Sequence, residues 1–268
     1  MIDQWNLMTD WHLVLPPSRP SATQLVRIRS QIDSFPKNRP IAILGSTPEF
    51  RDLVHECGFS QIYVLDKNAR FYRSMSTARV YRNAEQFVEG DWFNTLGTFK
   101  GEFSVILSDL TSGNISYESR KTFYDLITDA LCEGGLFLDK VLTHSSPHLS
   151  LEEIIRKYSQ LPLNLLHINY FSCEALFCSE LLDRRLLVDS SFFYSMLDEV
   201  VKNERVRRFV QKSKLITPPG CVWWYGRRWE ELSADYCSRL SLLEAQEDDP
   251  GSPYLGRLKF FAHRKDTQ

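Results

Sequence analysis

Residues 41–66 read IAILGSTPEFRDLVHECGFSQIYVLD. Two compact apolar runs, at 41–45 and 61–66, flank a mixed segment at 48–57 whose apolar residues recur at intervals of three and four. Compact apolar runs are typical of buried parallel strands, and apolar residues at intervals of three and four are typical of amphipathic helices. Because parallel strands need a long return connection, the stretch predicts a strand, a crossover helix and a second parallel strand.

The same alternation continues along the chain. The runs FSVILSD at 103–109 and GGLFLDKVL at 134–142 predict two further strands, and the short run QFV at 86–88 predicts another. Mixed segments at 69–78 and 117–133 predict the helices between them. We therefore expect an α/β fold with a doubly wound, Rossmann-like sheet of seven strands.

The end of the chain predicts the remaining strands. Segments 241–247 and 255–264 flank a Pro/Gly turn near 250–253, which is typical of an antiparallel hairpin at a sheet edge. From about 150 to 215 the pattern is helical and too long for a simple crossover, so it predicts a helical insertion over the strand ends. Further helices are predicted at 21–35, 149–161, 190–201, 203–214 and 226–240.

These patterns divide the chain into three parts. We expect an N-terminal lid and helical segment at 1–36, and a helical insertion that serves as lid or substrate region at 146–217. The Rossmann-like core would comprise 37–145 and 218–268. The rigid segment PPSRPS at 16–21 lies in the first part, together with Trp5 and Trp11.

Composition narrows the classes of function. The 268 residues are 43% hydrophobic and 25% charged, as expected of a globular protein. The net charge of −2 gives no general attraction to nucleic acid or membranes, and no apolar run is long enough to cross a bilayer. The six cysteines show no metal-ligand spacing, so we expect no metal site, reduced thiols and a cytoplasmic protein. The oligomeric state is left open, a homodimer included.

Polar residues follow the first two strands where each one ends. Gly45 can form a tight turn, and Ser46 or Thr47 can cap the next helix, with Glu49 completing a capping box. This segment alone fits a ligand-binding turn and a well-capped helix equally. Asp66 ends the second strand about 20 residues later, where a carboxylate can accept hydrogen bonds from both hydroxyls of a ribose.

The third and fourth strands end in a similar way. In EGDWF at 89–93, Asp91 can accept the exocyclic amine of adenine and Trp92 can stack on its ring. Asp109 ends the fourth strand in SDLTSGNI at 108–115, where a transferred group would face a substrate. Four such segments in order predict a nucleotide site along the carboxyl edge of the sheet.

LGSTPEFRDL, VLDKN, EGDW and SVILSDLTSGNI resemble motifs I to IV of the class I S-adenosylmethionine-dependent methyltransferases. The resemblance covers about residues 5–142 and includes PPSRPS. It is strongest to a bacterial subgroup whose first loop reads Gly-x-Thr-Pro-Glu, although most family members have two or three glycines in that loop. The resemblance implies S-adenosylmethionine as the cofactor. It implies the following cofactor residues: Gly45, Ser46, Thr47, Asp66, Lys67, Asn68, Gly90, Asp91, Trp92, Asp109 and Leu110.

The function implied is methyl transfer to an O, N or C nucleophile of a small molecule. Asp109 and His144, which follows the fifth strand, are the candidate catalytic residues that could take up a proton. His144 and His148 are four residues apart, but Pro147 argues against a helix that would let them share a metal. Two alternatives remain. The protein could bind S-adenosylmethionine without catalysis and act as a partner or regulatory protein, or it could use the sulfonium charge of the cofactor for chemistry other than methyl transfer.

Several features allow other interpretations. Tyr117 and Lys121 form the Y-x-x-x-K pair of short-chain dehydrogenases, but one glycine is too few for that family's pyrophosphate turn. The basic run at 202–214 would suit an RNA methyltransferase, although such a run is usually a solvated helix face. The aromatic run CVWWYGRRW at 221–229 could wall an apolar pocket or simply pack the insertion onto the core.

Overall fold

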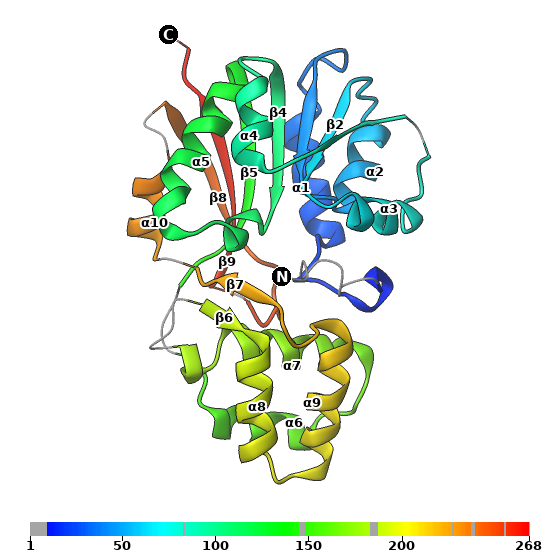
Figure 1. Cartoon of the computed structure of the whole chain (residues 1–268), viewed down its shortest axis with the longest axis vertical. Coiled ribbons are helices and arrows are strands. Elements are labelled where there is room, and N and C mark those ends of the chain that lie inside the picture. Colours follow the sequence, from blue (N-terminus) through cyan, green and yellow to red (C-terminus); the bar gives the residue numbers. More distant parts are fainter. Residues whose placement is uncertain are drawn as a thin grey trace.

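The computed structural model describes residues 10–82, 84–144, 148–182, 187–226, 228–236, 239–254 and 256–267. Its main feature is a seven-stranded sheet of order β3-β2-β1-β4-β5-β9-β8 (Figure 1). Strands β1 to β5 are parallel, and β9 is antiparallel to both β5 and β8. The strands are β1 (Ile41–Leu44), β2 (Ile62–Asp66), β3 (Gln86–Glu89), β4 (Phe103–Asp109), β5 (Leu131–Leu142), β8 (Leu240–Glu247) and β9 (Leu258–Lys265). This confirms the predicted fold class, including the terminal hairpin.

Helices cover both faces of this sheet. One face packs against α1 (Ala22–Ile32) and α2 (Pro48–Glu56), with α3 (Ala69–Thr77) beside α2. The other face packs against α4 (Trp92–Thr95), α5 (Tyr117–Ala130) and α10 (Trp229–Asp235). Side chains alternate between the faces, so Ile41 and Ile43 contact the first group, whereas Ala42 and Leu44 contact the second. Burial on both faces explains why these strands are uniformly apolar.

The fifth strand begins earlier than predicted. The helix expected to reach 133 ends at Ala130, and Leu131 already pairs with Phe103 of β4. The register between these strands then shifts at the glycine pair 134–135, where Gly134 has a φ of 70°. Glycine tolerates this backbone conformation at little cost, so the chain bulges there and continues as a strand.

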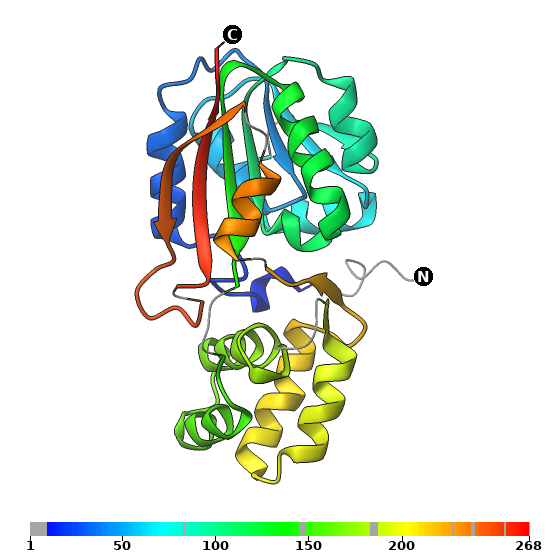
Figure 2. The same ribbon diagram turned by 90° about the vertical axis from the view of Figure 1, so that its left-hand side faces the viewer.

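The helical region forms a second body with its own core. It contains α6 (Leu151–Gln160), α7 (Leu165–Phe177), α8 (Ser190–Val200) and α9 (Glu204–Ile216). Buried aromatic side chains, including Tyr158, Phe171 and Phe209, join these helices. Figure 2 shows this body below the sheet, with the N-terminal segment between the two. The domain boundaries at 36, 145 and 217 stay a proposal.

A two-stranded ribbon that the sequence did not predict adjoins this body. Strand β6 (Leu187–Asp189) pairs antiparallel with β7 (Val222–Trp224). The short 3-10 helices are η2 (Trp11–Leu13), η3 (Leu96–Thr98), η4 (Thr111–Asn114) and η5 (Glu180–Leu182). Among the described residues, no helix combines the length and apolar character needed to span a membrane.

The described cysteines carry no disulfide. Cys173, Cys178 and Cys221 are buried, while Cys57 and Cys132 are partly exposed. Burial raises the pKa of the Cys173 thiol to about 11, so this group stays protonated at neutral pH. Cys237 lies outside the described residues.

A buried acid inside the core predicts an unusual pH dependence of stability. The Asp139 carboxylate accepts hydrogen bonds from the hydroxyls of Tyr124 and Tyr236, at 3.2 and 2.9 Å. Burial raises its pKa from 3.8 to about 6. The folded chain therefore holds this proton more tightly than the unfolded chain, so its contribution to stability is lost as the pH rises from about 4 to 6.

We expect Asp139→Asn to remove this loss, which corresponds to about 3 kcal/mol. The free energy of unfolding of the variant, relative to the natural chain, should rise by that amount between pH 4 and pH 7, as measured by denaturant titration. Burial lowers the pKa of the neighbouring His263 to about 4, which costs stability at acid pH, but this effect is common to both proteins. A pH-independent difference would show that Asp139 is not the group responsible.

Candidate functional site

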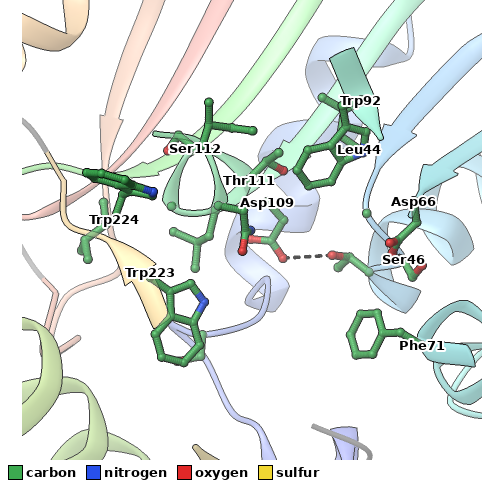
Figure 3. A pocket seen from close by; sticks show the side chains of 18 of the residues that line it. Leu44, Ser46, Asp66, Phe71, Trp92, Asp109, Thr111, Ser112, Trp223 and Trp224 are labelled. Carbon is green, nitrogen blue, oxygen red and sulfur yellow. Dashed lines mark hydrogen bonds between the residues drawn. The ribbon is translucent and has the colours of Figure 1, made fainter. Parts of the chain in front are cut away.

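A cleft lies at the carboxyl ends of β1, β2 and β4 and is bounded on its other side by the helical body. It is lined by all the predicted cofactor residues except Asn68 and Gly90. Figure 3 shows Asp66, Ser46 and Phe71 toward one end, Asp109 near the middle, and Trp223 and Trp224 toward the other end. The predicted site residues thus come from separate strands and meet at one edge of the sheet, as expected for a doubly wound fold.

The first loop is held by its hydroxyl groups. Gly45 has a φ of 87°, and a Cβ at this position would meet nothing within 4 Å. The Ser46 hydroxyl donates a 2.6 Å hydrogen bond to Asp66, and the Thr47 hydroxyl donates a 3.3 Å bond to Asp109. The loop therefore ties the ends of β1, β2 and β4 together and leaves open space at the glycine.

The predicted capping box is wrong. Thr47 is the N-cap of α2, but its side chain makes no capping bond, because its hydroxyl bonds to Asp109. Ser46 bonds to Asp66, and Glu49 accepts a hydrogen bond from the Trp11 indole. Each of these side chains finds a partner from a distant segment in place of a local backbone group.

Asp66 is buried and has well-defined partners. Only 5% of the residue is exposed, and its second carboxylate oxygen accepts a 3.0 Å bond from the backbone N–H of Asn68. The Asn68 side chain caps α3 by accepting from the N–H of Phe71, which itself lines the cleft. Asn68 therefore acts on the cleft indirectly, by setting the turn that follows Asp66.

The third strand contributes a turn and an indole ring. The Asp91 carboxylate caps α4 by accepting a 2.9 Å bond from the N–H of Phe93. The Trp92 indole donates a 2.8 Å bond to the carbonyl of Leu65, which holds the ring beside the end of β2. Gly90 lies outside the cleft lining, and a Cβ there would come within 2.7 Å of Thr95.

A buried ion pair lies beneath the middle of the cleft, where Asp109 lines the surface and Lys140 lies behind it. The Lys140 ammonium on β5 is 3.1 Å from a carboxylate oxygen of Asp109, and both side chains are almost fully buried. The same ammonium donates a 2.8 Å bond to the carbonyl of Pro17. Lys140 compensates the charge of Asp109 and ties the N-terminal segment to the sheet. Sequence analysis missed Lys140, although an unexpected cation inside an apolar strand was the available signal.

A second charged cluster supports the first loop from behind. Arg51 of α2 is fully buried and forms an ion pair with Glu85. Glu85 forms a second ion pair with Arg79 at 2.9 Å and accepts a 2.8 Å hydrogen bond from the Tyr72 hydroxyl. The pKa of the neighbouring His55 is lowered, mainly because the imidazole is buried. The cluster joins α2, α3 and the segment before β3, and these helices follow the loops that begin at Ser46 and Asp66.

The N-terminal segment crosses between the two bodies. Trp11 donates to Glu49 at 2.9 Å, and Arg19 lies 3.6 Å from the same carboxylate, whose pKa is raised mainly by burial. On the helical side, the N–H of Leu15 donates to Asn169 of α7 at 2.9 Å. Trp11 also lines the cleft. Trp5 lies outside the described residues.

The far wall of the cleft is largely aromatic. Trp223 and Trp224 of β7 line it together with Phe177 of α7. The Trp223 and Phe177 rings lie 5.5 Å apart, and Trp224 lies 5.1 Å from the Tyr117 ring. Trp223 and Trp224 of the aromatic run therefore line the cleft and also pack against aromatic side chains of the helical body and of the core.

A glycine after β7 allows this wall to approach the sheet. A Cβ on Gly226 would lie 1.9 Å from the carbonyl oxygen of Leu142 at the end of β5. We expect Gly226→Ala to displace the ribbon and to lower the free energy of unfolding by about 1–3 kcal/mol, as measured by denaturant titration. Gly97→Ala is the matched control, because its Cβ would meet Leu126 at an ordinary 3.8 Å. Equal effects of the two substitutions would contradict this account.

His144 does not line the cleft. Its Nε2 lies 3.3 Å from Nε2 of His148, and both rings contact Tyr225. The two histidines thus meet although they share no described helix; Pro147 lies outside the described residues. No group of three or more potential metal ligands occurs among the described residues. The position of His144 gives no support to a general-base role.

The remaining sequence features are accounted for by packing or solvent exposure. The Tyr117 hydroxyl donates to the carbonyl of Tyr225, and Lys121 pairs with Asp125 on the surface, so the Y-x-x-x-K residues do not act together on the cleft. Most of the basic run lies in α9, where Lys214 pairs with Asp198 and the arginines at 205, 207 and 208 are exposed. Such a solvated helix face was the favoured interpretation.

Comparison with known proteins supports the fold. No protein-family model and no curated protein matches the sequence. A solved structure from Methanosarcina mazei, described as an S-adenosylmethionine-dependent methyltransferase, is 11% identical with a TM-score of 0.53, covering 89% of this chain and 98% of that one. One from Listeria monocytogenes, provisionally assigned to the same class, is also 11% identical at a TM-score of 0.53, covering 92% and 100%.

The fold is that of the class I methyltransferases. A structure from Rhodobacter sphaeroides, provisionally assigned as a zinc-dependent alcohol dehydrogenase, is 13% identical with a TM-score of 0.59 and covers 99% of this chain and 100% of that one. At such identities each likeness concerns the fold alone. Function must therefore be argued from the residues of the cleft.

Proposed function

We propose that this protein is an S-adenosylmethionine-dependent methyltransferase that acts on a small molecule. The observation that carries the proposal is the position of Asp66: it ends β2, lies inside the cleft, and is joined through Ser46 to the glycine loop. A carboxylate can accept about four hydrogen bonds, so the bonds that Asp66 accepts from Ser46 and Asn68 are compatible with hydrogen bonds from ribose hydroxyls.

The residues fit this cofactor. The open space at Gly45 would let a ligand approach the main chain, as the methionine part would require. Lys67 would flank the adenosine, Asp91 and Trp92 would hold the adenine, and Leu110 would line the methyl end, all of them being residues of the cleft. The first loop, GSTPE at 45–49, supports membership of the subgroup with a Gly-x-Thr-Pro-Glu motif.

When bound, S-adenosylmethionine supplies a methyl group activated by its sulfonium charge. The chain would contribute by holding the reacting groups in line and by keeping water out. The N-terminal segment, tied to Glu49 and Lys140, and the helical body together cover the cleft. Asp109 is the carboxylate placed in the middle of the cleft, and it is our candidate to accept a proton from the substrate.

A specific observation motivates one alternative. The first loop has a single glycine, which would suit a protein that binds the cofactor and acts as a partner or regulator without methylating. An RNA methyltransferase is less favoured, since the exposed basic residues of α9 at 205, 207, 208 and 212 do not line the cleft. A nicotinamide enzyme would require a pyrophosphate turn richer in glycine.

Calorimetry tests the proposal directly. We expect the protein to bind S-adenosylmethionine and S-adenosylhomocysteine, with NAD as the negative control. Preferential binding of NAD, or no binding of either adenosyl compound, would overturn the proposal. Incubation with a methyl-labelled donor and small molecules extracted from cells then separates enzyme from regulator: labelled product supports catalysis, whereas tight cofactor binding without product favours the alternative.

A further inference from the structure

The two ends of the cleft differ in charge. Toward β1 and β2 it is lined by Asp66, Lys67 and Asp91, which are ionisable. Toward the helical body it is lined by Trp223, Phe177 and other apolar side chains: Leu142, Ile216 and Trp224. If the charged end takes the cofactor, as proposed above, the apolar end receives the methyl acceptor.

The aromatic rings at this end form a continuous wall. Phe177 lies 5.5 Å from Trp223 with the rings tilted by 57°, and 6.0 Å from Tyr254 at 88°. The Trp223 ring also lies near the loop after β4: a Cβ on Gly113 would be 3.8 Å from its Cδ1, which is an ordinary van der Waals distance. Rings supported on several sides keep their orientation and present flat apolar surfaces to a ligand.

A charged side chain, Arg120, also lines the cleft, but its guanidinium is bonded to the protein. Arg120 of α5 is 1% exposed and donates to the carbonyls of Ser112 and Ile115, at 3.0 and 3.3 Å. Its guanidinium also lies 4.6 Å from the centre of the Tyr117 ring. A ligand with a formal charge would lose hydration on entering this end, and the apolar wall would not replace it.

We propose that the apolar end of the cleft is an acceptor site for a flat, uncharged aromatic compound. This inference rests on the proposed function for the role of the ligand as acceptor. The wall would recognise the ring by stacking and exclusion of water. A phosphorylated or cationic acceptor with the same ring would be selected against by desolvation.

Binding of 2-naphthol, a neutral two-ring phenol, tests this proposal. Equilibrium dialysis in the presence of S-adenosylhomocysteine should show that 2-naphthol binds at least ~10-fold more tightly than 2-naphthyl phosphate, since the charged group must lose its hydration. Trp223→Ala should weaken 2-naphthol binding about 10-fold through the lost ring contact. Val222→Ala, on the neighbouring exposed position of β7, is the matched control and should leave binding unchanged.

A second pair of variants places a charge at the wall. Ile216 is 6% exposed and lines the cleft, whereas Leu215 beside it on α9 is 60% exposed. Ile216→Lys should abolish binding of 2-naphthol, and Leu215→Lys should not change it. A cooperative thermal unfolding transition, measured for each variant, shows whether the chain is folded.

The outcomes separate this inference from the proposed function. Tighter binding of 2-naphthyl phosphate, or 2-naphthol binding that is insensitive to both Trp223→Ala and Ile216→Lys, would overturn the aromatic acceptor site even if S-adenosylhomocysteine binds. If 2-naphthol binds with the expected dependence on Trp223 but S-adenosylhomocysteine does not bind, the apolar site stands and the methyltransferase proposal fails.

Discussion

Lys140→Met should lower the free energy of unfolding by about 3–5 kcal/mol, because it leaves the Asp109 carboxylate buried without its cationic partner. The pair is 3.1 Å apart, and the exposed fractions of the two side chains are 0% and 4%. Methionine has a similar length and no charge, so packing on β5 should be preserved while the ion pair is lost. Denaturant titration at neutral pH measures the effect.

Two controls make this result specific. Lys121→Met breaks the surface pair with Asp125, where the lysine is 67% exposed, and should cost less than about 1 kcal/mol. Adding Asp109→Asn to Lys140→Met removes the isolated charge and should recover much of the lost stability. If Lys140→Met lowers the free energy of unfolding no more than Lys121→Met does, the pair of Lys140 and Asp109 does not stabilise the fold.

Asp66→Ala should weaken the binding of S-adenosylhomocysteine by about 10- to 100-fold. The substitution removes the acceptor proposed for the ribose hydroxyls and also the partner of the Ser46 hydroxyl. Glu89→Ala is the matched control, because Glu89 pairs in register with Asp66 on the next strand but is exposed and lies outside the cleft lining. Calorimetry of both variants gives the affinities.

Ser46→Ala distinguishes a direct role of Asp66 from a structural one. It breaks the 2.6 Å bond but leaves the carboxylate in place, so its effect on affinity should be smaller than that of Asp66→Ala. An Asp66→Ala protein that binds as tightly as the natural chain would remove Asp66 from the cofactor site.

The elements that could be predicted from the sequence are those with local signals. Strands β1, β2 and β4 are buried on both faces, so each one reads as a short apolar run. Asp66 and Asp109 could be placed together because the carboxyl ends of parallel strands share one edge. Nothing beyond the order of the strands was needed for that inference.

The hydrogen bonds and ion pairs between side chains of distant segments could not be predicted. A hydroxyl before a helix usually caps it, but Ser46 lies within 2.6 Å of Asp66 and bonds to that stronger, charged acceptor. In the sequence Lys140 is an isolated charge within an apolar strand, and only the structure shows that Asp109 lies beside it. Strands β6 and β7 have three residues each and pair across more than 30 positions, so neither has a sufficient local pattern.

A crystal structure with bound S-adenosylhomocysteine would show whether Asp66 binds the ribose. We expect the adenosine across the carboxyl ends of β1 to β3, with ribose oxygens in hydrogen-bond contact with Asp66 and the sulfur near Asp109. The vacant side of that sulfur should face Trp223. A nucleoside bound elsewhere on the chain, or a ribose without contact to Asp66, would show that this edge of the sheet is not the cofactor site.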